Sequence, residues 1–139
     1  MSVETNRTLD RRWYEEVLNG HILATIDEIV AEDLIFNGAP IGRAGLRQGF
    51  LWMLSIIPDM HLTIEDVVAA GDKVVTRFTG YGTHQGPFMG VPPTGKAISM
   101  RITHIDRIAD GKIVERWENA DVFGVLQQLG TVLVPQNSE

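Results

Sequence analysis

Two side chains in the C-terminal half of the sequence are candidates for acid–base chemistry, His104 and Asp121. His104 lies in a run of alternating apolar residues and shares a strand face with Met100 and Ile102. A histidine that faces a cavity can donate or transfer a proton near neutral pH. The same pattern is equally typical of a hydrogen-bonded histidine in a core, and the residues alone do not choose between these interpretations.

Asp121 follows a strand pattern and has the same parity as Ile113 and Trp117, provided that no bulge intervenes. A carboxyl group at the end of an apolar strand is partly desolvated, which raises its pKa and improves it as a base near neutral pH. The alternative is structural, because aspartate is a favoured helix N-cap and a short helical pattern follows it. From the residues alone, the cap is the favoured interpretation.

Several other classes of site are excluded or disfavoured by what the sequence lacks. It contains no cysteine, which rules out disulfides and thiolate catalysis. No Gly-x-Ser-x-Gly motif and no phosphate-binding glycine loop are present, which argues against a serine hydrolase and a nucleotide site. We expect no metal site, since the four histidines, at positions 21, 61, 84 and 104, have neither HxH nor HxxxH spacing.

Composition favours a single globular domain over residues 1–139, with 44% hydrophobic and 22% charged residues. The formal net charge of −6 argues against a nucleic-acid partner, which would require a basic face. The N-terminal residues are polar, and no segment approaches the roughly 20 apolar residues that span a bilayer. We therefore expect no membrane association and a cytoplasmic location.

The elements that position these residues divide into helices followed by strands. Apolar stripes predict three helices, within residues 9–18, 22–30 and 46–57, and a short strand is expected at residues 34–36. Period-2 patterns then predict strands over residues 62–69, 73–84, 97–109 and 112–119, with a closing helix near 123–129 and a loose tail at 134–139. The dipeptide Asp110-Gly111 predicts a two-residue hairpin turn. Segregated helices and strands indicate an α+β fold, with three N-terminal helices packed on a curved antiparallel sheet.

Two segments carry a resemblance to a known family. Residues 82–96 read GTHQGPFMGVPPTGK and are similar to the GTHxGxFxGxPPTGK segment of the SnoaL-like polyketide cyclases. Residues 107–117 read RIADGKIVERW and resemble the RxxDGKIVExW hairpin of that family, and residues 121–130 resemble its ending. The helical opening at residues 12–20 also fits. The resemblance implies the cone-shaped NTF2-like fold, with a deep pocket between helices and sheet.

The resemblance also implies a function. Such enzymes close a ring of an aromatic polyketide in antibiotic biosynthesis by intramolecular aldol condensation, without metal or organic cofactor. The aspartate of the motif W-x-x-x-D is their proposed acid/base, and Asp121 holds that position here. A relative of the same fold group is associated with hydroxylation of polyketides, and a non-catalytic binding or dimerisation module is a third reading. Homo-oligomers, as dimers or tetramers, are the expected assembly.

Two positions depart from the family pattern: Arg116 stands where histidine is common before the tryptophan, and Asn37 stands at another histidine position. An amide can orient a ligand carbonyl but cannot shuttle a proton. The resemblance therefore implies a cyclase in which Asp121 removes a proton from carbon while His104 and Asn37 donate hydrogen bonds to ligand oxygens. The candidate pocket walls are Trp13, Phe50, Met53, Phe78, Met100 and Trp117, for each of which core packing is the alternative.

Overall fold

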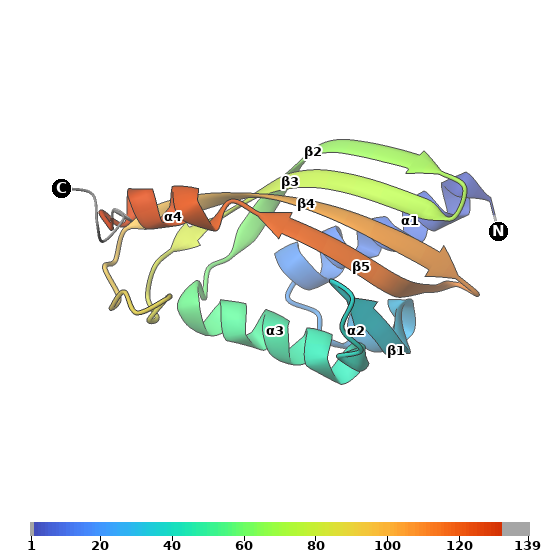
Figure 1. Cartoon of the computed structure of the whole chain (residues 1–139), viewed down its shortest axis with the longest axis horizontal. Helices are drawn as coiled ribbons and strands as arrows, with labels where there is room; N and C mark the ends of the chain where they lie inside the picture. The colour runs from blue at the N-terminus through green and yellow to red at the C-terminus, as the bar shows by residue number, and fades with distance from the viewer. Residues whose placement is uncertain (1, 132–139) are drawn as a thin grey trace, which may run out of the picture.

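Four strands of the sheet are antiparallel to their neighbours, and a fifth joins one edge in parallel (Figure 1). The computed structural model describes residues 2–131, and the sheet order is β1-β5-β4-β3-β2. The strands are β1 (Val30–Phe36), β2 (His61–Ala70), β3 (Lys73–Thr83), β4 (Ala97–Ala109) and β5 (Lys112–Ala120). The expected sheet was antiparallel throughout. The difference arises at β1, because the chain leaves it through a long helix and adds the next strand at the opposite edge.

All of the helices except the last lie over one face of this sheet, and the last follows the end of β5 (Figure 1). They are α1 (Val3–Arg12), η1 (Trp13–Asn19), α2 (Ala24–Ile29), α3 (Gly42–Ile56) and the closing α4 (Val122–Gln128). The three predicted N-terminal helices are confirmed, with one difference in the first. It begins at Val3, where the Ser2 hydroxyl accepts a hydrogen bond from the Thr5 amide at 3.0 Å, and its second half, η1, is a π-helix. Such helices are rare and are frequent at functional sites.

The hairpin between β4 and β5 follows the prediction at its turn and departs from it three residues later. Asp110 and Gly111 both have positive φ, at 51° and 73°, as a two-residue hairpin turn requires. Ile108 pairs with Ile113, but Arg107 pairs with Glu115. Val114 is therefore an extra residue, a β-bulge in β5.

This bulge reverses which side chains of β5 face the helices. A one-residue shift in a strand moves every later side chain to the opposite face. Beyond Val114, Arg116 is buried and Glu118 half-buried, whereas Trp117 and Asn119 are exposed. The predicted shared face of Ile113, Trp117 and Asp121 is therefore wrong.

Two apolar clusters pack between the helices and the sheet. The larger joins α1, η1 and α2 to the middle of the sheet and includes Tyr14, Ile26 and Phe78. The smaller lies where α3 ends and includes Phe88 and Leu126.

Within residues 2–131, no helix is both long and apolar enough to cross a membrane. The predicted tail at 134–139 lies outside the described residues.

Candidate active site

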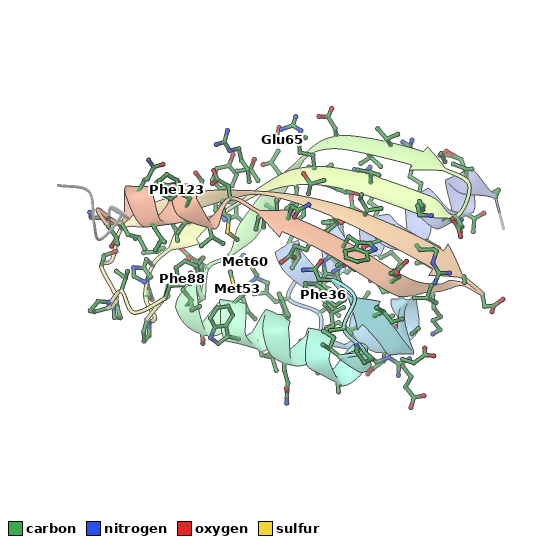
Figure 2. All side chains as sticks on the ribbon, viewed as in Figure 1. Phe36, Met53, Met60, Glu65, Phe88 and Phe123 are labelled. Atoms are coloured by element: carbon green, nitrogen blue, oxygen red, sulfur yellow. The ribbon has the colours of Figure 1, made fainter. Side chains whose placement is uncertain are left out.

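A cavity of about 270 Å³ lies between α3 and the sheet, near the lower end of the ~300–1,000 Å³ range typical of small-molecule pockets. Its walls are almost entirely apolar. In Figure 2, Met53, Met60 and Phe88 lie between α3 and the sheet, whereas Glu65 projects away from the opposite side of the sheet. The lining side chains that solvent also reaches include Ile41, the N-cap of α3, and Trp52 within α3, so the cavity opens along this helix.

Most of the predicted pocket walls lie on this cavity. Its lining includes Trp13, Phe50, Met53, Phe78, Met100 and His104. The predicted inward face of β4 is also confirmed, since Ile98, His104 and Asp106 are all buried. Three predicted site residues, Asn37, Trp117 and Asp121, are not part of the lining.

A chain of hydrogen bonds begins at Tyr14, which is buried behind the cavity wall, and leads to two residues of the lining, His104 and Glu118. The Tyr14 hydroxyl lies 2.8 Å from His104 Nδ1, and His104 Nε2 lies 2.7 Å from Glu118 Oε1. Phe78 packs edge-on against both the tyrosine and the histidine ring, with centroid separations of 5.1 and 5.0 Å. His104 and Glu118 are direct partners across the β4–β5 ladder. The buried histidine thus holds a carboxylate that faces an apolar cavity.

The environment keeps His104 neutral and Glu118 ionised at neutral pH. Burial lowers the pKa of His104, and the positive charge of Arg116 lowers it further, against the effect of Glu118. Burial alone would raise the pKa of Glu118, but the hydrogen bond from His104 and the charges around it leave that pKa below its ordinary value. The lowered pKa keeps the Glu118 carboxylate ionised at neutral pH, and therefore in the form that can accept a proton from a ligand.

Arg116 forms the second polar element of the wall. Its Nε and Nη2 donate to the two carboxylate oxygens of Asp106 at 2.8 and 2.9 Å, and both side chains are fully buried. Its guanidinium carbon lies 4.3 Å from the centre of the Trp13 ring. Burial would raise the pKa of Asp106, yet Arg116 lowers it to about 2. The pair is therefore ionised and rigidly oriented.

Asp10, on α1, is a further buried carboxyl group whose pKa the charges of Arg116 and Asp106 affect. It is 1% exposed, and neither of its carboxyl oxygens has a hydrogen-bond donor among the described residues. Burial raises the pKa of Asp10 well above 3.8, and the negative charge of Asp106 raises it further. Asp10 is therefore held as a protonated, neutral acid near the ionised Asp106.

Replacement of Asp10 by asparagine is expected to change how stability depends on pH. A carboxyl with a raised pKa stabilises the fold below its unfolded-state pKa, and this contribution is lost as pH rises through the folded-state value. Asparagine keeps the shape and does not ionise. Between about pH 4 and pH 8, the wild type should therefore lose free energy of unfolding relative to Asp10→Asn. Urea unfolding across this range measures the difference, and parallel profiles would contradict a protonated Asp10.

The expectation that Asp121 is a desolvated base with a raised pKa is wrong. It is the N-cap of α4, where its carboxylate accepts a hydrogen bond from the Gly124 amide at 2.9 Å and pairs with Arg101 at 3.0 Å. Both interactions lower its pKa, with the Gly124 hydrogen bond the larger cause. The carboxylate lies at the surface and stays ionised, so the helix-cap alternative is confirmed.

Asn37 and Trp117 also lie elsewhere than predicted. The side-chain oxygen of Asn37 accepts a hydrogen bond from the backbone amide of Glu118 at 2.8 Å. The backbone amide of Asn37 donates to the Arg116 carbonyl at 2.9 Å. It therefore joins the end of β1 to β5 instead of facing the cavity. Trp117 is 45% exposed because the bulge turns it outward, where its ring lies against Gly38.

Three residues of the site were missed from the sequence: Arg116 and Glu118, which line the cavity, and Tyr14, which lies behind the lining and contacts His104. Strand parity pointed away from Glu118, and no local signal marks the bulge that reverses it. Tyr14 could have been found from its place beside Trp13 in the first helical stripe.

No group of three His, Asp or Glu side chains that could hold a metal ion occurs between residues 2 and 131.

Comparisons with known proteins agree on one family. Residues 8–129 match the family model described as SnoaL-like polyketide cyclase. The structure is similar to that of IdmH from Streptomyces antibioticus, a proposed polyketide cyclase, with TM-score 0.81 and 34% identity over 91% of this chain and 99% of that one. It is also similar to AclR from Streptomyces galilaeus, a proposed hydroxylase, with TM-score 0.85 and 29% identity over 97% of this chain and 91% of that one.

A curated relative shows the same relationship over a shorter stretch. Aklanonic acid methyl ester cyclase DnrD from Streptomyces peucetius is 35% identical over 72 residues, which cover 52% of this chain and 50% of that protein. The chain thus spans about half the length of this curated relative.

Proposed function

Because the chain belongs to the SnoaL-like polyketide cyclase family, we propose that it closes a ring in an apolar polyketide by an intramolecular aldol reaction. One observation carries the proposal: the carboxylate of Glu118 faces an apolar cavity and is held by a buried neutral histidine. It replaces Asp121, the residue expected from the motif, as the acid/base of the proposed mechanism.

In this mechanism Glu118 removes a proton from a ligand carbon that lies between two carbonyl groups. The resulting enolate carbon attacks another carbonyl of the same molecule and forms the new carbon–carbon bond. The alkoxide then takes the proton back from Glu118, so the product is an isomer of the substrate. These steps move only protons and carbon electron pairs and need no oxidant.

Arg116 is the group that we assign to the negative charge on the enolate oxygen. Nε and Nη2 each donate one hydrogen bond to Asp106, whereas Nη1 donates none to the described residues, so we assign Nη1 to a ligand oxygen. A cation fixed before the reaction stabilises developing charge without reorganisation. His104 was expected to donate to the ligand, but both of its ring nitrogens are occupied. We assign it the role of holding Glu118, and Asn37 that of holding the backbone there.

The direct test is incubation with aklanonic acid methyl ester, the compound in the name of the DnrD relative. Nogalonic acid methyl ester, from the name of a second relative, is the alternative substrate. A cyclised product of unchanged mass is expected, with a new ring visible by NMR. If neither of the two methyl esters is converted, that result would count against the proposal for this substrate class.

Hydroxylation is the second candidate, and the likeness to AclR favours it. The same incubation separates the two reactions, because hydroxylation adds one oxygen atom to the product and requires molecular oxygen. Binding of an ester without turnover would instead favour a non-catalytic binding module.

Gly49 offers a test of the cavity that does not depend on turnover. It lines the cavity near the mouth, and a Cβ built there meets no heavy atom within 4 Å. Gly49→Ala should raise the free energy of unfolding by about 0.5–1 kcal/mol, since glycine is unfavourable within a helix. Gly49→Phe should weaken binding of a neutral anthraquinone at least tenfold, measured by quenching of tryptophan fluorescence. Equal affinity in Gly49→Phe and Gly49→Ala would place the ligand elsewhere.

We also propose that two copies of the chain pair through the outer face of the sheet. Trp117 and Ile105 are cross-strand partners there, 45% and 37% exposed. Burial of these neighbouring apolar side chains in a shared contact favours a partner with the same surface. Sedimentation measures the oligomeric state: the wild type should sediment as a pair and Trp117→Lys as a single chain, and a wild-type monomer would contradict the proposal.

A single domain over 1–139 and a cytoplasmic location stay predictions.

A further inference from the structure

We propose that Tyr14 is a positioning residue that fixes the protonation pattern of His104 and thereby aims the carboxylate of Glu118 into the cavity. This inference rests on the proposed function in one respect, the role of Glu118 as the base. It concerns a residue from the N-terminal π-helix, far in sequence from the rest of the site.

The geometry around Tyr14 leaves little freedom to either ring. Tyr14 is 1% exposed and His104 2% exposed, and their ring centroids lie 5.7 Å apart. Phe78 contacts both rings edge-on from β3. Rotation of the imidazole would break both of its hydrogen bonds inside a packed core.

The order of donors along the chain follows from what each group can do. Glu118 is ionised and can only accept a hydrogen bond, so His104 Nε2, at 2.7 Å, must carry the proton. A neutral imidazole then has a bare Nδ1, which accepts from the Tyr14 hydroxyl at 2.8 Å. Tyr14 can serve as this donor because burial and nearby carboxylates keep its hydroxyl protonated.

Loss of the Tyr14 hydroxyl would leave Nδ1 unpaired in a buried position. The imidazole would then bind a second proton more easily, since the donor that competes for Nδ1 is gone. The charged groups that act on His104 are Arg116, which opposes this proton, and Asp106 and Glu118, which favour it. A cationic His104 would hold the Glu118 carboxylate in an ion pair and weaken it as a base.

The test begins without any substrate. Nitrogen-15 NMR of histidine-labelled wild-type protein near pH 7 should show His104 neutral, protonated at Nε2 and bare at Nδ1. Tyr14→Phe should raise the pH at which His104 gains its second proton. The matched control is Tyr81→Phe, the other tyrosine, which stacks on His61 and should leave the His104 signals unchanged.

With the ester assay, Tyr14→Phe should lower kcat roughly tenfold, as expected for one lost hydrogen bond, with KM unchanged. The acid limb of its pH–rate profile should move to higher pH. A wild-type His104 protonated at Nδ1, or an unshifted profile in Tyr14→Phe, would overturn the inference. These outcomes are separate from a failure of the proposed function, which would appear as full activity in a variant without the Glu118 carboxylate.

Discussion

Glu118→Gln is expected to lower kcat for a polyketide ester by about 10²–10⁴-fold, the range that general acid–base groups contribute. The amide keeps the shape of the side chain and cannot take a proton from carbon. It also sits in the same apolar wall, so binding of the ester should change little. Stopped-time assays by mass spectrometry and NMR measure the loss, and fluorescence quenching measures binding separately.

The matched control is Asp121→Asn, which makes the same carboxylate-to-amide change at the residue that the sequence motif favoured. Asparagine is a good helix N-cap, so this variant should keep both its stability and a rate close to that of the wild type. Loss of turnover in Asp121→Asn, with turnover retained in Glu118→Gln, would reverse the assignment. Loss in neither variant would remove both carboxylates from the mechanism.

Arg116→Met is expected to cost about 3–5 kcal/mol of the free energy of unfolding, because it leaves the buried carboxylate of Asp106 without its partner. Methionine fills much of the same space, so the loss of charge pairing dominates over the loss of packing. That cost is a large share of the 5–15 kcal/mol typical of a domain. Urea unfolding monitored by circular dichroism measures it.

The double variant Arg116→Met with Asp106→Leu separates pairing from packing. It removes both charges, and buried ion pairs replaced by apolar side chains are often neutral for stability. Recovery of most of the lost free energy is therefore expected. If Arg116→Met alone loses less than about 1 kcal/mol, the Asp106 carboxyl has another source of stabilisation.

The parts of the fold that were predicted well are those specified by local pattern. The β4 boundaries, Ala97–Ala109, coincide with the predicted range because its alternation is unbroken and a turn follows at once. The parallel edge at β1 depends instead on contacts such as Phe36 with Arg116, which no local pattern encodes. The π-helical turn at Trp13–Asn19 is likewise hidden, since its apolar spacing also fits an ordinary helix.

The residues of the site likewise fall into those that local sequence patterns placed correctly and those that they did not. Apolar residues such as Phe50 and Phe78 were placed on the cavity wall because helical and strand periodicity settle which face they occupy. Asp121 shows the reverse case: its cap signal was visible in the residues, and the motif match outweighed it. Glu118 could not be reached by parity, because the physical cause of its orientation is a single irregular residue upstream.

The bulge at Val114 makes the orientation of the proposed base, Glu118, depend on chain length as well as on side-chain type. Deletion of that one codon would leave Glu118 and His104 in the protein sequence but would turn the carboxylate to solvent and Trp117 toward the helices. An alignment that misplaces a gap by one residue here would likewise compare an inward side chain with an outward one. A length change that alters neither Glu118 nor His104 would therefore be enough to abolish the proposed reaction.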